Sequence, residues 1–221
     1  MTLAFLSPSA DALCRSPMER QARAAGASFE ERDGWNVPVR FDGEDAERER
    51  TRSTVGFADM SHLGKVEVQG EHVPELELGR ATLAEGVWWL PYTQERAVAL
   101  CEPAGLAAVR EGLAGGVDVT TAFAALAIEG PLARELFARF TAIDLREQAT
   151  FVHGFRPGSV ARTPGAILRQ ANQRWLMLFG AALGQYMWTV VADAAESLGG
   201  GPVAADVLTP VGERTEVAPH A

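Results

Sequence analysis

Residues 57–70 read FADMSHLGKVEVQG and hold the densest group of unusual side chains in the chain. From Lys65 to Gln69, polar side chains alternate with valines, which is the period-two pattern of a strand with one buried face. Ser61, His62 and Lys65 lie at the start of this strand, where a rigid element presents polar groups to a ligand. Two interpretations are open from these residues alone: a polar turn before a strand, and the mouth of a ligand site.

Length and composition indicate an ordinary globular protein. The chain has 221 residues, of which 47% are hydrophobic and 22% charged, so it suits one large domain or two closely packed halves. The net charge of -9 and the pI of about 5.0 argue against a broad nucleic-acid surface.

The two cysteines, Cys14 and Cys101, have neither the pairing of a disulfide framework nor metal-ligand spacing. We therefore expect no metal site and a reducing, cytoplasmic location. The apolar start of the chain lacks a basic lead-in, and no apolar run reaches the roughly 18 residues that cross a bilayer. The sequence predicts a soluble protein without a signal peptide or membrane span.

The first half of the chain is predicted to alternate helices and strands. Pro17 at a first turn and Gly26 at an end indicate one helix, and the charged residues 44–54 indicate an exposed one. The further elements expected are a strand at 65–69, a helix at 71–79, an aromatic strand at 85–92, a strand at 96–101 and a helix at 103–113.

The second half repeats this order. It is predicted to contain a strand at 123–130, a helix at 131–140, a strand at 173–179 and a long helix at 181–198 whose apolar residues recur at helical spacing. We interpret the repeat as a divergent duplication with halves at about 57–117 and 118–208, sharing one α+β core. Residues 1–15 are expected to form a loose arm, and residues 209–221 a loose tail.

Four motifs connect the chain to a known family. SPME at 16–19, GWNVPV at 34–39, DMSHLGKVEVQG at 59–70 and LAIEGPLAR at 126–134 resemble the signatures of the glycine-cleavage T-protein (aminomethyltransferase) family. The resemblance spans roughly residues 16–208. It implies a tetrahydrofolate-binding α+β module of duplicated, interleaved strand-helix halves, here without the family's C-terminal barrel. In length the chain is similar to the gamma subunit of heteromeric sarcosine oxidase, a relative of the same module.

Two acidic features of the family are replaced. The family's Gly-Gly, Asp-Asp segment after the aromatic strand has no counterpart in WLPYTQER at 89–96. The pterin-contacting glutamate of the family corresponds to Leu176. Because an apolar leucine cannot replace charge-assisted hydrogen bonds to a pterin, we expect no standard aminomethyl transfer by this chain alone.

Five residues are candidates for the site. His62 has a side chain suited to acid–base catalysis, although in the resembled family this turn mainly shapes the pocket. Leu63 stands where relatives place an apolar contact to the folate ring, and core packing is its other interpretation. Trp89, Tyr92 and Trp175 are candidate walls for a flat cofactor, or core residues.

The sequence leaves open whether the chain is an enzyme. The first hypothesis is a folate-dependent aminomethyl or methyl transferase with a degenerate acidic site, acting on an amine-derived substrate within a complex. The second is a non-catalytic, gamma-like subunit of a sarcosine or amine oxidase, and a third is a pocket that takes another small molecule. We also expect an obligate partner, in a homo-oligomer or in a hetero-complex with an oxidase or a second folate-type chain.

Overall fold

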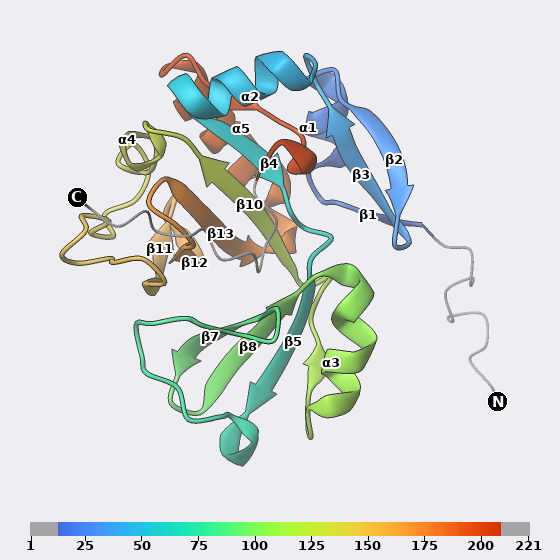
Figure 1. The fold of residues 1–221 in the computed structure, drawn as a ribbon, viewed down its shortest axis with the longest axis vertical. Helices are drawn as coiled ribbons and strands as arrows, with labels where there is room; N and C mark the ends of the chain where they lie inside the picture. Colours follow the sequence, from blue (N-terminus) through green and yellow to red (C-terminus); the bar gives the residue numbers. More distant parts are fainter. Residues whose placement is uncertain (1–12, 209–221) are drawn as a thin grey trace.

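The computed structural model describes residues 13–208, which form a mixed α+β fold on three β-sheets. Figure 1 shows a six-stranded sheet with helices above it and a five-stranded sheet below. A three-stranded sheet lies beside the upper part, on the side of the N-terminus. The predicted α+β class is confirmed. Residues 1–12 of the expected arm and the whole expected tail lie outside the described residues.

The six-stranded sheet joins segments from both halves of the chain. Its strand order is β11-β12-β13-β10-β4-β14. The strands are β4 (Gly56–Asp59), β10 (Phe123–Glu129), β11 (Phe155–Val160), β12 (Thr163–Arg169), β13 (Arg174–Gly180) and β14 (Gly201–Pro202). In the central strand β10, Leu126 pairs with Met177 on one side and with Asp59 on the other. The strand that precedes the DMSHLG turn is thus held in the sheet of the second half.

The five-stranded sheet comes from one continuous part of the chain. Its order is β6-β7-β8-β5-β9. The strands are β5 (Gly64–Gln69), β6 (Thr82–Ala84), β7 (Val87–Thr93), β8 (Arg96–Cys101) and β9 (Val117–Asp118). The strands predicted at 65–69, 85–92 and 96–101 are confirmed as β5, β7 and β8.

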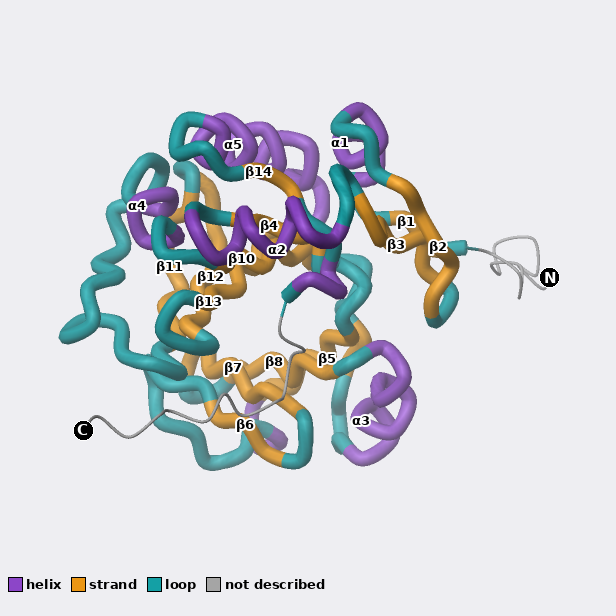
Figure 2. Tube along the Cα trace, turned by 45° about the horizontal axis from the view of Figure 1, so that its top comes forward, coloured by secondary structure: helices purple, strands orange, loops and turns teal. Residues whose placement is uncertain are grey.

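The remaining elements cover the sheets from outside. The three-stranded sheet consists of β1 (Cys14–Arg15), β2 (Ser28–Arg32) and β3 (Trp35–Arg40). The helices are α1 (Glu19–Ala24), α2 (Glu44–Ser53), α3 (Leu106–Gly112), α4 (Ala133–Phe137) and α5 (Gly184–Glu196), with 3₁₀-helices η2 (Gly70–His72), η3 (Pro103–Gly105), η4 (Ala181–Leu183) and η5 (Ala205–Val207). Figure 2 shows α5 and α2 next to the six-stranded sheet and α3 beside the five-stranded sheet. None of the helices within 13–208 is long and apolar enough to cross a membrane.

Two apolar layers result from the alternation of side chains along the strands. In β13, Trp175, Met177 and Phe179 enter an outer core shared with α1, α4 and α5. Leu176 and Leu178 of the same strand enter an inter-sheet core, which lies between the two large sheets. Both faces of β13 are therefore covered, and its sequence is continuously apolar for that reason.

The chain crosses between the two large sheets twice, and the crossings are bonded to each other. The N–H of Met60, after β4, donates to the carbonyl of Ala125 (2.9 Å). The N–H of Lys65, in β5, donates to the hydroxyl of Thr120, which precedes β10 (3.0 Å). These bonds fix the turn between β4 and β5 at the junction of the sheets.

The helix predicted at 71–79 is wrong. Only the 3₁₀-helix η2 forms. It ends at His72, and the next residue, Val73, has an extended backbone with φ of -73° and ψ of 122°. Pro74 explains this, because proline disfavours helical geometry in the preceding residue and cannot donate a helical hydrogen bond.

The hairpin of β11 and β12 was not predicted. Its turn residues Ala161 and Arg162 have φ values of 47° and 63°. Turns with these left-handed φ values usually contain Asn or Gly, so the sequence lacks the residues that commonly predict a hairpin here. The helix predicted at 44–54 is confirmed as α2, but its charges are not all solvated: Glu47 is 1% exposed.

Candidate functional site

Asp59 ends β4 and begins the crossing to the second sheet. Its side chain is buried, and its Oδ1 accepts a hydrogen bond from the N–H of Ser61 (2.9 Å). Burial raises the pKa of Asp59, against the lowering effect of hydrogen bonds from Ser16 and Ser61. Its Oδ2 has no hydrogen-bond partner among residues 13–208. This carboxylate shapes the turn by closing an Asx-type hydrogen bond.

Lys65 is fully buried, although the sequence placed it at the mouth of a site. Its Nζ donates to the carbonyl oxygens of Ser61 (3.0 Å) and Leu63 (2.7 Å). Burial lowers the pKa of Lys65 to about 8, and the nearby Asp59 and Asp118 oppose this shift. Ser61 also points inward, where its Oγ accepts the N–H of Ala125 (3.3 Å). Lys65 and Ser61 therefore tie the crossing together and are not presented to a ligand.

His62 is the half-buried residue of the turn. Burial lowers its pKa to about 4, and the positive charges of Lys65 and Arg32 act in the same direction. Its imidazole is therefore neutral at pH 7 and is a poor general acid there. The structure favours the shaping role of His62 over the acid–base role, which remains a prediction.

The inter-sheet core brings together the two positions that the resemblance assigns to a folate ring. Leu63 and Leu176 are both 0% exposed and both belong to this core. Trp88 lies in the same core, with its ring edge-on to His153 at a centroid distance of 4.9 Å. Because these side chains pack against one another, the ring position is filled by the chain itself. The residues present do not fit a pterin.

The three predicted aromatic residues lie in three different places. Trp89 is half-buried, and the pleat of β7 turns it away from the inter-sheet core that Trp88 enters. Trp175 is in the outer core, against Phe137. Tyr92 packs against the edge of the inter-sheet core. The structure therefore does not gather Trp89, Tyr92 and Trp175 around one ligand, nor does it place them around His62.

A buried arginine at the start of β13 was not among the candidates predicted from the sequence. Arg174 is 5% exposed, and its Nη1 donates to Glu129 of β10 (2.6 Å). Burial lowers its pKa, although Glu129 raises it. The sequence did contain an indication of this pair. Glu129 closes β10 and Arg174 opens β13, and the antiparallel register places the two residues opposite each other.

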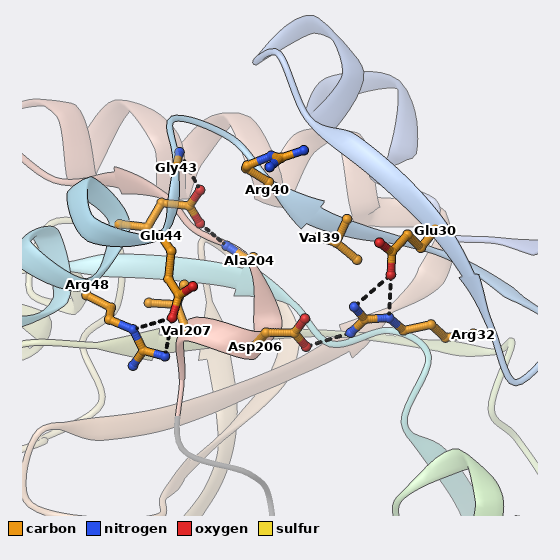
Figure 3. A pocket seen from close by; sticks show the side chains of 11 residues that line it. Glu30, Arg32, Val39, Arg40, Gly43, Glu44, Arg48, Ala204, Asp206 and Val207 are labelled. Atoms are coloured by element: carbon orange, nitrogen blue, oxygen red, sulfur yellow. Dashed lines mark hydrogen bonds and ion pairs between the residues drawn. The ribbon is translucent and has the colours of Figure 1, made fainter.

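Figure 3 shows a polar cavity of about 400 Å³ between β2, β3, α2 and the segment after β14. Arg32 in its wall bonds to Asp206 (2.6 Å) and to Glu30 (2.9 Å). Arg48 bonds to Glu44 (2.7 Å). Since these charges neutralise one another within the wall, the cavity does not present a strong field to a ligand. No group of three potential metal ligands occurs among residues 13–208.

A second cavity, of about 360 Å³, contains Tyr92 and Arg96. It opens beside the hairpin of β11 and β12 and reaches Gly180 at the end of β13. Arg174 lies at the opposite end of that strand. Tyr92 and Leu178 of this cavity adjoin the inter-sheet core, although neither Leu63 nor Leu176 lines the cavity itself.

Comparison with known proteins gives a family for the N-terminal part. Residues 18–79 match the family described as the GCVT N-terminal domain. Over 186 residues the chain is 27% identical to the aminomethyltransferase of Mycobacterium bovis, an alignment that covers 71% of this chain and 50% of that relative. The chain thus spans about half the length of the curated relatives it matches.

Two solved structures share the fold. The glycine cleavage system aminomethyltransferase T from Bartonella henselae has a TM-score of 0.70 at 16% identity, covering 88% of this chain and 60% of that one. A chain of the heterotetrameric sarcosine oxidase from Corynebacterium sp. U-96 has a TM-score of 0.63 at 19% identity, covering 86% of this chain and 99% of that one. The resemblance inferred from the four motifs is confirmed. At these identities the structures establish the fold alone.

Proposed function

We propose that this chain, whose residues 18–79 belong to the GCVT N-terminal domain family, is an aminomethyltransferase-like subunit that acts within a larger assembly. In this proposal the chain does not carry out tetrahydrofolate-dependent transfer alone. It contributes the folded module, and a partner chain supplies the chemistry. The form of assembly we favour is a heteromeric amine oxidase in which this chain is a gamma-like subunit.

The observation that carries the proposal is the burial of Leu176. The resemblance assigns this position to the pterin-contacting glutamate, and here the side chain is 0% exposed in the inter-sheet core. Opening that core for a polar ring would remove several leucine side chains from their contacts. Each fully buried leucine contributes about 1.5–3 kcal/mol relative to exposure, so a ring bound there would have to offset a large loss.

The choice of assembly is supported by the fold shared with a chain of a heterotetrameric sarcosine oxidase, which this chain matches over 99% of that chain's length with a TM-score of 0.63. Aminomethyl transfer within a complex is the second candidate. The retained signature at 59–70, inside the matched region 18–79, favours it.

The first test is binding and turnover by the purified chain. We expect no saturable heat on titration with tetrahydrofolate, and no transfer from an aminomethyl donor, while circular dichroism shows a folded protein. Stoichiometric binding or turnover by the isolated wild-type chain would contradict the proposal. Leu63→Glu and Trp89→Ala serve as controls, because binding that Leu63→Glu leaves unchanged would place any folate site outside the inter-sheet core.

The second test is assembly. Coexpression with the chains of neighbouring genes is expected to give a complex of fixed stoichiometry in analytical ultracentrifugation. Sarcosine oxidation by that complex, lost when this chain is omitted, supports the gamma-like role. Aminomethyl transfer by the complex without oxidation supports the second candidate. A monodisperse monomer that associates with none of these chains would overturn both.

A further inference from the structure

The cavity beside Tyr92 has walls from three separate parts of the fold. Tyr92 and Arg96 come from the hairpin of β7 and β8, and Pro157 and Pro164 come from the hairpin of β11 and β12. Phe123 and Gly180, which pair across β10 and β13, complete it. The walls are thus mainly aromatic, proline and glycine surfaces with few polar groups. Ligand sites commonly have this composition and this range of volume.

Gly180 accounts for part of the open space. Its φ of -60° and ψ of 133° are ordinary extended values that any residue adopts. A Cβ atom built on Gly180 would have no heavy atom within 4 Å. A larger side chain is therefore permitted by both the backbone and the surroundings, so the conformation of the chain does not require glycine at this position.

Two hydrogen-bond donors line the cavity. The ring of Tyr92 is fixed edge-on against Phe155 at a centroid distance of 5.1 Å, and burial raises the pKa of its hydroxyl to about 12. The hydroxyl therefore stays protonated. It has no hydrogen-bond acceptor among residues 13–208.

Arg96 supplies the positive charge. Its Nε and Nη2 donate to Oε2 of Glu67 at 2.9 and 2.5 Å. Within the described part of the chain its Nη1 has no acceptor. The arginine side chain is 39% exposed and the glutamate 12%, and Glu67 is not part of the cavity wall. A bound molecule would thus meet the guanidinium before the carboxylate.

We propose that this cavity binds a small planar aromatic carboxylate. The flat ring packs between Phe123 and the two prolines, and the carboxylate accepts hydrogen bonds from Arg96 and from the Tyr92 hydroxyl. Charge-assisted hydrogen bonds to a guanidinium are roughly twice as strong as neutral ones, which favours an acid over a neutral ring. The inference goes beyond the proposed assembly role and does not depend on it. Tyr92 and Leu178 of this site adjoin the inter-sheet core, but Leu63 and Leu176 do not line the cavity.

The test uses 4-fluorobenzoate with the full chain, followed by fluorine NMR line broadening. Saturable broadening is expected with a dissociation constant on the order of 1 mM, as suits a ligand of this size. Gly180→Leu fills the cavity and is expected to weaken binding at least about tenfold. Gly112→Leu is the matched control, because Gly112 is also free of neighbours within 4 Å but lies in α3, and it is expected to bind as the wild type does.

Two further comparisons test the chemistry of recognition. Benzoate is expected to compete with the probe, whereas cyclohexanecarboxylate, which carries the same charge on a puckered ring, is expected to compete at least about threefold less well. Tyr92→Phe keeps the ring against Phe155 and is expected to weaken binding about three- to tenfold. Thermal melts of each variant establish that it is folded.

The outcomes are decisive in both directions. Binding that is lost in Gly180→Leu and kept in Gly112→Leu supports the site. Absence of saturable broadening up to about 10 mM would overturn it, as would equal binding by wild type and Gly180→Leu. Competition by cyclohexanecarboxylate as strong as that by benzoate would exclude a planar aromatic ligand. Tetrahydrofolate binding and assembly with an oxidase are measured separately, in the tests of the proposed function.

Discussion

Oε2 of Glu47 accepts a hydrogen bond of 2.6 Å from the backbone N–H of Ala204, 157 residues later in the chain. The other carboxylate oxygen accepts three N–H groups of the loop before α2, from Phe41 (2.8 Å), Asp42 (3.2 Å) and Gly43 (3.2 Å). One buried carboxylate therefore joins α2 to the segment that follows β14. It also satisfies four backbone donors that would otherwise lack a protein partner.

Replacement of Glu47 by alanine is expected to lower the free energy of unfolding by about 3 kcal/mol or more. The reason is that several buried N–H groups lose their acceptor, and each costs about 1–3 kcal/mol. Urea denaturation followed by circular dichroism measures the loss. Glu44→Ala on the same helix is the control, because its exposed pair with Arg48 contributes less than about 1 kcal/mol. Equal losses in the two variants would show that Glu47 has no special role.

Stability below neutral pH is expected to depend on His62. Its pKa of about 4 in the folded chain is below the ordinary value of 6.5, so the unfolded chain binds the proton more readily between these values. Stability contributed by the neutral imidazole is present above pH 6.5 and is lost as the pH falls towards 4. His62→Gln removes this titration. With allowance for solvent screening of a half-buried group, the stability advantage of wild type over His62→Gln should shrink by about 1–2 kcal/mol between pH 7 and 4.5. Parallel pH profiles would refute this expectation.

Leu176→Glu restores the type of residue that the resemblance assigns to this position. We expect it to destabilise the chain by about 3 kcal/mol or more, because a carboxyl group enters the inter-sheet core without a partner. Leu176→Met nearly conserves volume and is expected to cost less than about 1.5 kcal/mol. Chemical denaturation compares the two. A stable Leu176→Glu variant that also binds tetrahydrofolate would mean that the core opens as a pocket.

Glycine replacements are expected to have opposite effects at two positions. A Cβ atom on Gly200 would overlap the carbonyl oxygen of Val55, so Gly200→Ala should lose about 1–3 kcal/mol or more. A Cβ on Gly112 in α3 meets no neighbour within 4 Å, so Gly112→Ala should gain about 0.5 kcal/mol by restricting the unfolded chain. Thermal melts give both shifts. A Gly200→Ala variant as stable as wild type would contradict the tight packing of β14 against this segment.

Local sequence patterns predicted those elements whose apolar residues repeat at strand or helix spacing, or whose ends are marked by proline or glycine. The alternation from Lys65 to Gln69 predicted β5, and the apolar stripe of 181–198 predicted α5. The prediction of a helix at 71–79 was wrong, because Pro74 ends helical geometry there despite the apolar spacing. The sequence patterns also missed the hairpin of β11 and β12, whose left-handed turn uses Ala161 and Arg162 in place of glycine. In both places a backbone constraint, and not hydrophobic periodicity, decides the structure.

The candidate site was predictable only in part. The motif resemblance assigned Leu63 and Leu176 to one folate ring, and the structure does bring them into one apolar core. It could not be foreseen that the core would be filled, because filling depends on Trp88 and on the leucines of the facing sheet. Neighbouring residues of a strand point to opposite faces of the sheet. Trp89 therefore points away from the inter-sheet core that Trp88 enters, and Trp175 enters the outer core while Leu176 enters the inter-sheet core.

The sequence by itself determined the family resemblance, the α+β class and the strands β5, β7, β8, β10 and β13, because those depend on residue order and local period. Only the tertiary structure decided the state of the polar residues of the DMSHLG turn. Lys65 and Glu47 look like surface charges in the sequence, yet both are buried and satisfied by backbone groups. Lys65 Nζ donates to the nearby carbonyls of Ser61 and Leu63, whereas Glu47 also accepts the N–H of Ala204, 157 residues away. Burial, the partner of each charge and the space beside Tyr92 are properties of packing between distant segments. These properties cannot be read from the local sequence.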